Sequence, residues 1–331
     1  LAFLSFSIAN IGFADQIAVM HESTDHSEIR IISSQKTDDY AVVTPFQWNI
    51  YPELSRDGRL LAFVGGPDQE HLAIQLKNLE TGTIDQISET VGFVLHPAFS
   101  GDAQKLSYSE IGDNGKNHIV VFNRLTGLYD KIEDVDASLF FPQLNSDGSF
   151  IVYQKSLSKT ERVLIEKYLG EDDEVELKLP SRNCMAPNIS FDDRKIAFTC
   201  LVDGLWNVYM MDRASKTVEQ ITTSASRSFA PAFDRHGQIY YAEEVNGKFE
   251  IYVAKRVHEE WTSFPFWSLE NSLYSPSLTG DTSYSQSDVS DVPSPARSSF
   301  GGLELNGKLY LIGGHQGHEH TYPPESFLDR V

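Results

Sequence analysis

The segment HQGHEH near the end of the chain brings three histidines close together. Imidazoles at this spacing could hold a transition metal such as zinc. No carboxylate or imidazole stands at a defined spacing to orient such ligands, and the segment has the character of a loop. We therefore interpret His315, His318 and His320 as a solvated loop and predict no metal and no other cofactor.

Other chemistry-bearing motifs are absent from the sequence. It contains no glycine-rich phosphate loop of the form GxxxxGK[ST] and no GxSxG nucleophile turn. The sequence therefore identifies no catalytic residue. Any binding residues must be positioned by the repeats that fill most of the chain.

Six copies of one segment recur along the sequence. Their prolines lie 44 or 45 residues apart, and the residue two positions after each proline is apolar, as expected of a core position. A period of this length with short strands and polar turns predicts the blades of a β-propeller. The copies are YPELSRDGRLLAF from Tyr51, HPAFSGDAQKLSY from His96, FPQLNSDGSFIVY from Phe141, APNISFDDRKIAF from Ala186, APAFDRHGQIYY from Ala230 and SPSLTGDTSY from Ser275.

The two ends of the repeat array complement each other. Three strands are expected in IAVM, EIRIIS and YAVVT, before the first copy, whereas the last copy supplies one strand and then turns polar. Joined together they make one blade, which would close the ring and remove exposed sheet edges. We predict an all-β fold, a six-bladed β-propeller with four-stranded blades over residues 15–285, in which residues 17–44 complete the blade of Pro276.

The repeats resemble the WD-like repeats of the TolB propeller. The resemblance rests on the proline, the S-x-D-G turn, the following apolar run and endings such as EQITTS, and it covers most of the chain. We expect no counterpart here of the α/β domain that precedes the TolB propeller, because blade strands are predicted from residue 15 onward. The resemblance implies architecture more than activity, because such blades also occur in peptidases, lyases and binding scaffolds.

The ends of the chain differ from the repeats. Residues 1–14 are apolar and end in Gly-Phe-Ala, which predicts the remainder of a secretory signal peptide, with a buried N-terminal strand as the alternative. Residues 286–296 have the composition of a linker. Residues 297–331 resemble the start of a Kelch repeat through Gly301, Gly302, Tyr310, Gly313 and Gly314, and we expect a separate unit; the alternative is a hairpin that packs on the propeller.

The net charge of −20 restricts the choice of partner. Nucleic-acid binders present basic stripes, so no nucleic-acid partner is predicted. After residue 14, no stretch resembles a membrane-spanning helix. We expect a periplasmic or secreted protein.

Residues around the anchor prolines are the candidate binding site. The innermost strands of a propeller line its channel, and their ends form the channel mouth, where mixed aromatic, polar and charged side chains suit a ligand or a peptide. We predict a scaffold that binds a protein or peptide there, and the enzyme hypothesis is the less favoured one. The alternative is a carbohydrate-active propeller, such as a sugar oxidase, epimerase or lyase, which would need a metal or a charged cluster in the channel. Two or more histidines that face each other there would favour it. The candidates are Trp48, Glu53, His96, Gln143, Asn188, Arg227 and Tyr274.

The two cysteines belong to one repeat. Cys184 precedes the APNIS strand and Cys200 ends the KIAFTC strand, and a hairpin turn near Asp192 places them opposite each other. Their Cα atoms would then lie within disulfide range. In an oxidising compartment we expect a disulfide bond; two buried thiols are the alternative.

Overall fold

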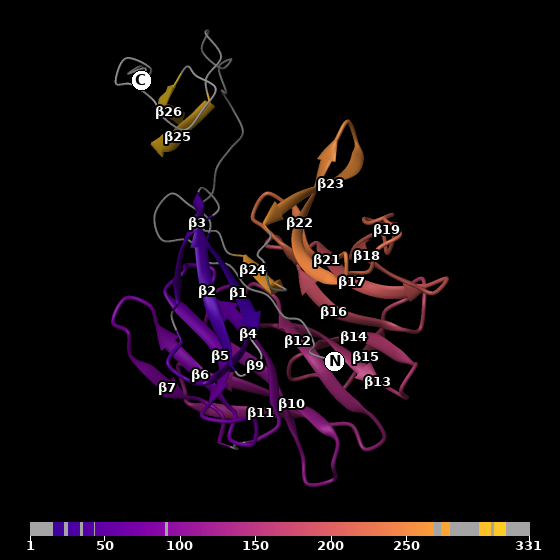
Figure 1. Ribbon diagram of the computed structural model, residues 1–331. Coiled ribbons are helices and arrows are strands. Elements are labelled where there is room, and N and C mark those ends of the chain that lie inside the picture. The colour runs from indigo at the N-terminus through magenta and orange to yellow at the C-terminus, as the bar shows by residue number, and fades with distance from the viewer. Residues whose placement is uncertain are drawn as a thin grey trace. The chain divides into compact units, whose positions relative to one another are not determined.

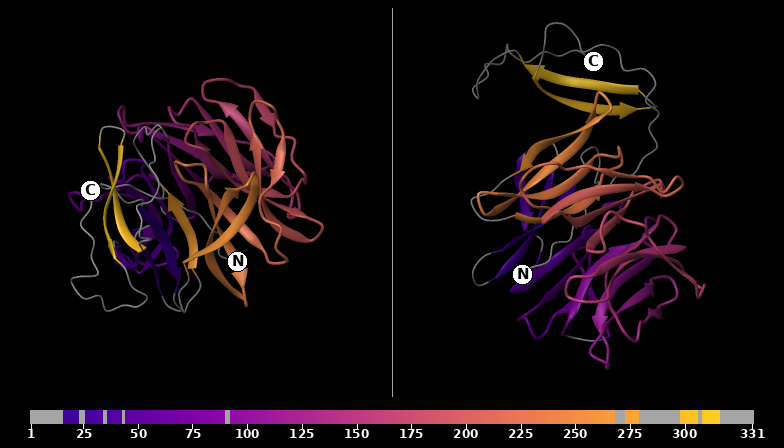
Figure 2. Two further views of the ribbon diagram at one scale, coloured as in Figure 1. Left: turned by 90° about the horizontal axis from the view of Figure 1, so that it is seen from above. Right: turned by 90° about the vertical axis from the view of Figure 1, so that its right-hand side faces the viewer.

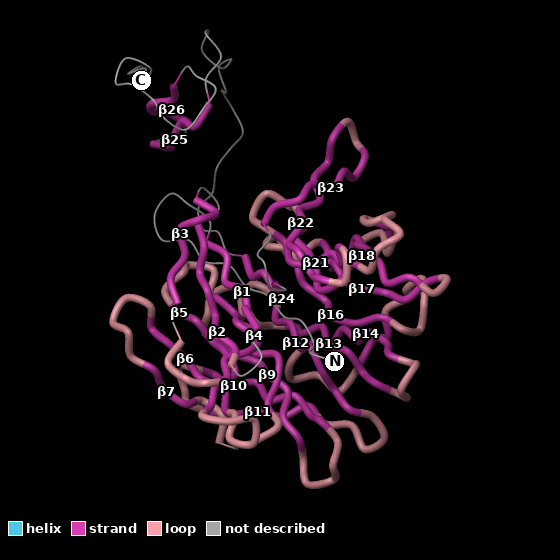
Figure 3. The backbone as a smooth tube through the Cα atoms, viewed as in Figure 1, coloured by secondary structure: helices cyan, strands magenta, loops and turns pink. Residues whose placement is uncertain are grey.

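The computed structural model describes residues 16–22, 26–33, 36–42, 44–89, 92–267, 273–278, 298–305 and 308–315. The chain falls into two compact units, one that ends at Asp281 and one that begins at Thr282. Every regular element among the described residues is a strand, as Figure 3 shows.

Five consecutive four-stranded antiparallel sheets form most of the first unit, and each is built from one continuous stretch of chain. Each sheet holds its strands in sequence order, so the first strand of each is an edge (Figure 1). The strands are β4 (Trp48–Leu54), β5 (Leu60–Gly66), β6 (Ala73–Asn78) and β7 (Ile84–Gln86); β8 (Val94–Phe99), β9 (Lys105–Ile111), β10 (Asn117–Asn123) and β11 (Leu128–Ile132); β12 (Ser138–Leu144), β13 (Phe150–Ser156), β14 (Arg162–Tyr168) and β15 (Glu174–Glu176); β16 (Cys184–Ile189), β17 (Lys195–Val202), β18 (Leu205–Asp212) and β19 (Val218–Gln220); β20 (Ser228–Phe233), β21 (Ile239–Val245), β22 (Lys248–Val257) and β23 (Glu260–Trp267).

A further four-stranded sheet is composed from both ends of the unit. Its order is β24 (Leu273–Leu278), β1 (Gln16–Glu22), β2 (Ser27–Ser33) and β3 (Lys36–Val42). Ile17 pairs with Leu278 and Ala18 with Ser277 in an antiparallel ladder. The expected pairing of the N-terminal strands with the strand of Pro276 is therefore confirmed.

The sheets are arranged as blades around a channel. The inner strands β4, β8, β12, β16 and β20 each contact the next, and β24 contacts both β20 and β4. Figure 2 shows the same succession of sheets around the unit from two further directions. The complete blades number five rather than the predicted six. The reason is that the last repeat contributes only β24, and the remaining four-stranded sheet depends on strands borrowed from the start of the chain.

The repeated S-x-D-G motif forms the turn between the first two strands of a blade. Ser55 Oγ donates a hydrogen bond to Asp57 Oδ1 (2.6 Å) and accepts one from the Leu60 amide (3.0 Å). Gly58 follows with a φ of 72°, in the left-handed region that glycine adopts at little cost. Ser100 with Asp102 and Ser190 with Asp192 repeat the hydroxyl–carboxylate bond.

A β-bulge precedes each anchor proline in these five blades. The residue before the proline has a φ between 49° and 54°, although it is Tyr51, His96, Phe141, Ala186 or Ala230 and never glycine. At the same point the ladder slips by one residue, so that Ile50 pairs with Val64 but Glu53 pairs with Ala62. The extra residue therefore keeps Ile50 and Glu53 on one face, whereas regular alternation would put them on opposite faces.

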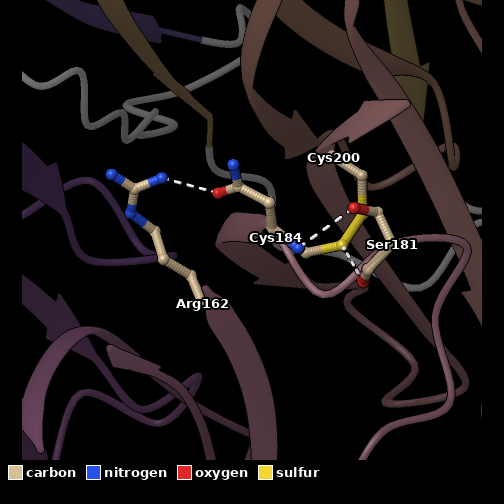
Figure 4. The surroundings of a disulfide bond; sticks show 5 residues. Arg162, Ser181, Cys184 and Cys200 are labelled. Atoms are coloured by element: carbon tan, nitrogen blue, oxygen red, sulfur yellow. Dashed lines mark hydrogen bonds between the residues drawn. A yellow bond between two sulfur atoms is a disulfide. The ribbon is translucent and has the colours of Figure 1, made fainter. Parts of the chain in front are cut away.

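The two cysteines form the predicted disulfide, shown in Figure 4. Cys184 on β16 lies directly opposite Cys200 on β17, with Cα atoms 4.1 Å apart, and both side chains are fully buried. Beside the bond, Arg162 donates a hydrogen bond to Asn183 Oδ1 (2.6 Å) and so ties the third blade to the fourth.

The second unit contains a two-stranded antiparallel sheet of β25 (Ser298–Leu305) and β26 (Lys308–His315). A hairpin was expected there, but its assignment as a Kelch repeat has no support, because no family model matches the chain. Residues 1–14 and 286–296, the predicted signal remnant and linker, lie outside the described residues. Among the described residues, no helix has the length and apolar character to cross a membrane.

Candidate functional site

Three of the seven predicted binding residues come together in one cavity. Glu53, Gln143 and Asn188 each follow an anchor proline, on β4, β12 and β16, and we call them the polar layer. The cavity encloses about 40 Å³, room for a few water molecules. Besides the polar layer, Arg56, Ser100 and Phe191 are among its lining residues.

The polar layer connects neighbouring blades by hydrogen bonds. Asn188 Oδ1 accepts a hydrogen bond from the Phe233 amide on the next inner strand (2.9 Å), and its Nδ2 donates to Gln143 Oε1 on the preceding one (3.5 Å). The Glu53 carboxyl accepts a hydrogen bond from the Phe99 amide in the same way. These three residues, each directly after a proline, therefore fasten their blades to the next ones as well as facing the cavity.

Burial governs the charge of Glu53. Removal from water raises the pKa of its carboxyl well above the usual range, and the opposing effects of the Phe99 amide and of Arg56 are smaller. A protonated carboxyl can donate as well as accept a hydrogen bond. The raised pKa thus favours a protonated carboxyl beside the two amides of the polar layer.

Arg56 closes the cavity on the side of the hairpin turns. Its Nη1 donates to Ser146 Oγ (2.7 Å) and to the carbonyl of Phe191 (3.3 Å), and its guanidinium lies over the Phe191 ring at 4.5 Å. Burial lowers the pKa of this guanidinium, whereas the nearby Asp193 carboxylate raises it. We call the channel end formed by these turns the turn mouth.

A layer of rings lies next to the polar layer. Tyr51, His96 and Phe141, the residues before the first three prolines, form this aromatic layer. The His96 ring stacks on Phe141 with centroids 3.7 Å apart and contacts Tyr51 at 4.6 Å. His96 is 4% exposed, and neither ring nitrogen has a hydrogen-bond partner. Burial therefore lowers its pKa to about 3, and the ring is neutral at ordinary pH.

The other predicted residues lie elsewhere. Trp48 packs half-buried against the core between the first two blades. Arg227 precedes β20 and forms an ion pair with Glu244 instead of lining the cavity. Tyr274 belongs to β24, but its side chain lies outside the described residues. His96 is in the channel but is enclosed by aromatic rings.

Sequence reasoning did not identify Arg56, Ser100 and Phe191. Arg56 and Phe191 stand four residues after their prolines, beyond the strand ends that were expected to form the site. Comparison of equivalent repeat positions would have provided the signal. The residues that converge in the polar layer all occupy the position after the proline, whereas Trp48, Arg227 and Tyr274 occupy other positions.

The part of the chain that the structure describes contains no group of three histidine, cysteine, aspartate or glutamate side chains that could hold a metal ion. The described inner strands carry a single histidine, His96, so among these strands no pair of histidines faces across the channel. Of the HQGHEH segment, His318 and His320 lie outside the described residues, as does the side chain of His315.

Comparisons with known proteins agree on the fold. No family model and no curated protein matches the chain. TolB from Acinetobacter baumannii is similar in structure, with a TM-score of 0.69 at 18% identity over 80% of this chain and 67% of that one. The putative TolB from Agrobacterium tumefaciens gives 0.58 at 16% identity over 77% and 90%. A puromycin-hydrolyzing peptidase from Mycobacterium tuberculosis gives 0.58 at 12% identity over 79% and 45%. At such identities the likeness establishes a TolB-like propeller fold and leaves the activity open.

Proposed function

We propose that this chain is a propeller scaffold that binds a protein or peptide partner at one end of its channel. The observation that carries the proposal is an aromatic patch of Trp206, Phe229 and Phe249. The Phe229 ring lies 5.6 Å from that of Trp206 and 5.9 Å from that of Phe249, and all three side chains are half-buried. Partly desolvated aromatic side chains are the residues that most often anchor protein interfaces.

The patch lies at the channel end opposite the turn mouth. Trp206, Phe229 and Phe249 are each the second residue of their strands, β18, β20 and β22. At the same end, Ile50, Leu95 and Phe140 occupy the position of Phe229 in the first three blades and are also half-buried. We call this end the apolar mouth. It offers apolar side chains beside the Arg227–Glu244 ion pair.

Exposed apolar side chains extend the apolar mouth outward. Phe93 is 52% exposed and Ile111 48% exposed, and the Ile111 amide donates to the Phe93 carbonyl (3.1 Å), so the two side chains belong to one corner of the second blade. Leu205, next to Trp206, is 39% exposed. Exposed apolar side chains that cluster favour an interaction site over chance exposure.

A periplasmic or secreted location completes the proposal. Its support is the disulfide Cys184–Cys200, because such bonds persist in oxidising compartments. Among the described residues, no observation favours the carbohydrate-active alternative.

Selection from a phage-displayed library of random peptides tests the proposal. We expect enriched peptides with aromatic or aliphatic anchors, and titration calorimetry should show that Phe229→Ser weakens their binding by about 1–3 kcal/mol. The matched control is Phe264→Ser on β23, which removes an exposed phenylalanine away from the mouth. No enrichment, or equal losses in both variants, would refute a binding site at the apolar mouth.

A further inference from the structure

Arg56 reaches across the channel. It stands in the turn between β4 and β5 of the first blade, whereas its acceptors stand in the turns of the third and fourth blades, at Ser146 (2.7 Å) and Phe191 (3.3 Å). The inner strands contact one another in the order β4, β8, β12, β16, β20 and β24, so β16 is three steps from β4 in either direction. A side chain that joins the first blade to the fourth therefore spans the ring.

The second blade leaves space for this crossing. A Cβ atom at Gly101 would lie 2.4 Å from Arg56 Nη1, 2.6 Å from its Cζ and 2.8 Å from the Cα of Ser146 on the next blade. Gly101 does not have the left-handed backbone conformation that requires glycine, and equivalent positions carry Ser146, Phe191 and Arg235. A side chain at Gly101 would therefore collide both with the guanidinium and with the backbone of the third blade.

The far end of Arg56 is held by a prearranged set of groups. Ser146 receives support from Asp193, whose Oδ1 accepts hydrogen bonds from the Ser146 amide (3.0 Å) and hydroxyl (2.8 Å). Ser146 Oγ also lies 3.1 Å from the Phe191 carbonyl, the second acceptor of Arg56. The Phe191 ring beneath the guanidinium adds a cation–π contact. The position of Arg56 is therefore fixed by several blades together.

We propose that Arg56 seals the channel at the turn mouth by crossing from the first blade to the turns of the third and fourth blades. The cavity of about 40 Å³, which Arg56 lines together with the polar layer, is then closed to solvent on this side. For a partner, the consequence is that its segment cannot thread through the ring. Only this last consequence rests on the proposed peptide-binding function.

Thiol labelling measures the seal directly. The reporter is Ala232→Cys, which places a thiol at a buried residue of the cavity lining; both native cysteines are in the disulfide, so it is the only free thiol. A small charged methanethiosulfonate reagent is added to the folded full chain. We expect Arg56→Ala to raise the labelling rate by about tenfold or more, because the seal no longer has to open first.

Two further variants make the result decisive. Gly101→Ala retains the arginine, but its methyl group would displace Arg56 and press on the Cα of Ser146. It should raise the rate as well, and it serves as the test if Arg56→Ala does not fold. The control Arg59→Ala removes an arginine from the same turn, one that faces solvent and pairs with Glu80, and should leave the rate unchanged. Equal labelling rates in the parent and in folded Arg56→Ala or Gly101→Ala would refute the proposal that Arg56 seals the turn mouth. The assay contains no peptide, so its outcome is independent of the phage selection.

Discussion

The polar layer and the aromatic layer lie two residues apart on the same inner strands, yet they hold their polar groups in opposite ways. In the polar layer the Asn188 amide has a partner on each neighbouring blade. In the aromatic layer His96 is buried against Phe141 with neither nitrogen paired. A polar side chain directly after the proline can therefore reach hydrogen-bond partners on both neighbouring blades, whereas His96, directly before its proline, contacts only rings.

The largest effect on stability should come from removing one ring of the aromatic layer. Phe141→Ala removes a buried ring that stacks on His96, and we expect a loss of about 3–5 kcal/mol in the free energy of unfolding, measured by urea denaturation. The backbone itself tolerates alanine, because Ala186 has the same left-handed conformation at the equivalent position. Phe93→Ala, at a half-exposed site, is the control and should cost less than about 1 kcal/mol. Equal losses of stability in Phe141→Ala and Phe93→Ala would mean that the aromatic layer contributes no more to stability than a half-exposed side chain does.

The buried imidazole of His96, which has no hydrogen-bond partner, should make the free energy of unfolding depend on pH in the acid range. His96 has a folded pKa of about 3, and an unfolded histidine has about 6.5. Between these values only the unfolded chain takes up the proton, so the free energy of unfolding falls as pH decreases below 6.5, by up to about 1.4 kcal/mol per pH unit.

Two substitutions separate the titration of His96 from its missing hydrogen bonds. His96→Gln and His96→Phe should both flatten the acid slope, but only His96→Phe should also stabilise the protein at pH 8, by about 1 kcal/mol, since it removes the unpaired polar atoms. Denaturation curves at several pH values provide the measurement. An unchanged acid slope in both variants would show that His96 is not the titrating group.

The polar layer should respond to pH in the opposite direction. The folded pKa of Glu53 is raised above its unfolded value, so its contribution is fully present below about pH 4.3 and is lost as pH rises toward the folded pKa. Glu53→Gln keeps the shape and the acceptor for the Phe99 amide but cannot ionise. We expect similar stabilities near pH 4 and a growing advantage of the variant at higher pH, by up to about 1.4 kcal/mol per pH unit until the folded pKa is reached. A variant that loses stability relative to the parent above pH 5 would mean that Glu53 is charged in the folded protein.

Much of the fold followed from the repeat period alone. The spacing of the prolines locates every inner strand, and the incomplete units at the two ends predicted the pairing of Ile17 with Leu278. The facing of Cys184 and Cys200 followed from counting residues back from one turn. Each of these features depends on the register of one strand pair, and that register can be read from the apolar pattern and the turn positions in the sequence.

The candidate site was less accessible to the sequence, for physical reasons. The bulge before each proline places Tyr51 and His96 in a conformation that side-chain preferences disfavour, and it changes which residues share a face. The crossing of Arg56 depends on Gly101, Ser146 and Phe191, which come from three other repeats. The sequence pattern within a single repeat does not indicate a contact between the first repeat and the fourth.

The smallest effect should come from Arg227, the arginine that was expected at the channel mouth. Its ion pair with Glu244 raises the pKa of Arg227, but the side chain is half-exposed, so water and salt screen the attraction. We expect Arg227→Ala to cost less than about 1 kcal/mol in the free energy of unfolding, a difference that should vanish at high salt.

Arg213 provides the matched control for Arg227. It is largely buried, donates two hydrogen bonds to Glu166 (2.8 and 3.2 Å) and lies over the Phe150 ring at 3.8 Å. Removing it leaves Glu166 without its partner, so we expect Arg213→Ala to cost about 3 kcal/mol. If Arg227→Ala instead cost as much as Arg213→Ala, or abolished binding of the selected peptides, Arg227 would belong to the site after all. A small loss with unchanged peptide affinity would leave Arg56 as the arginine that governs the channel and Arg227 as a surface ion pair.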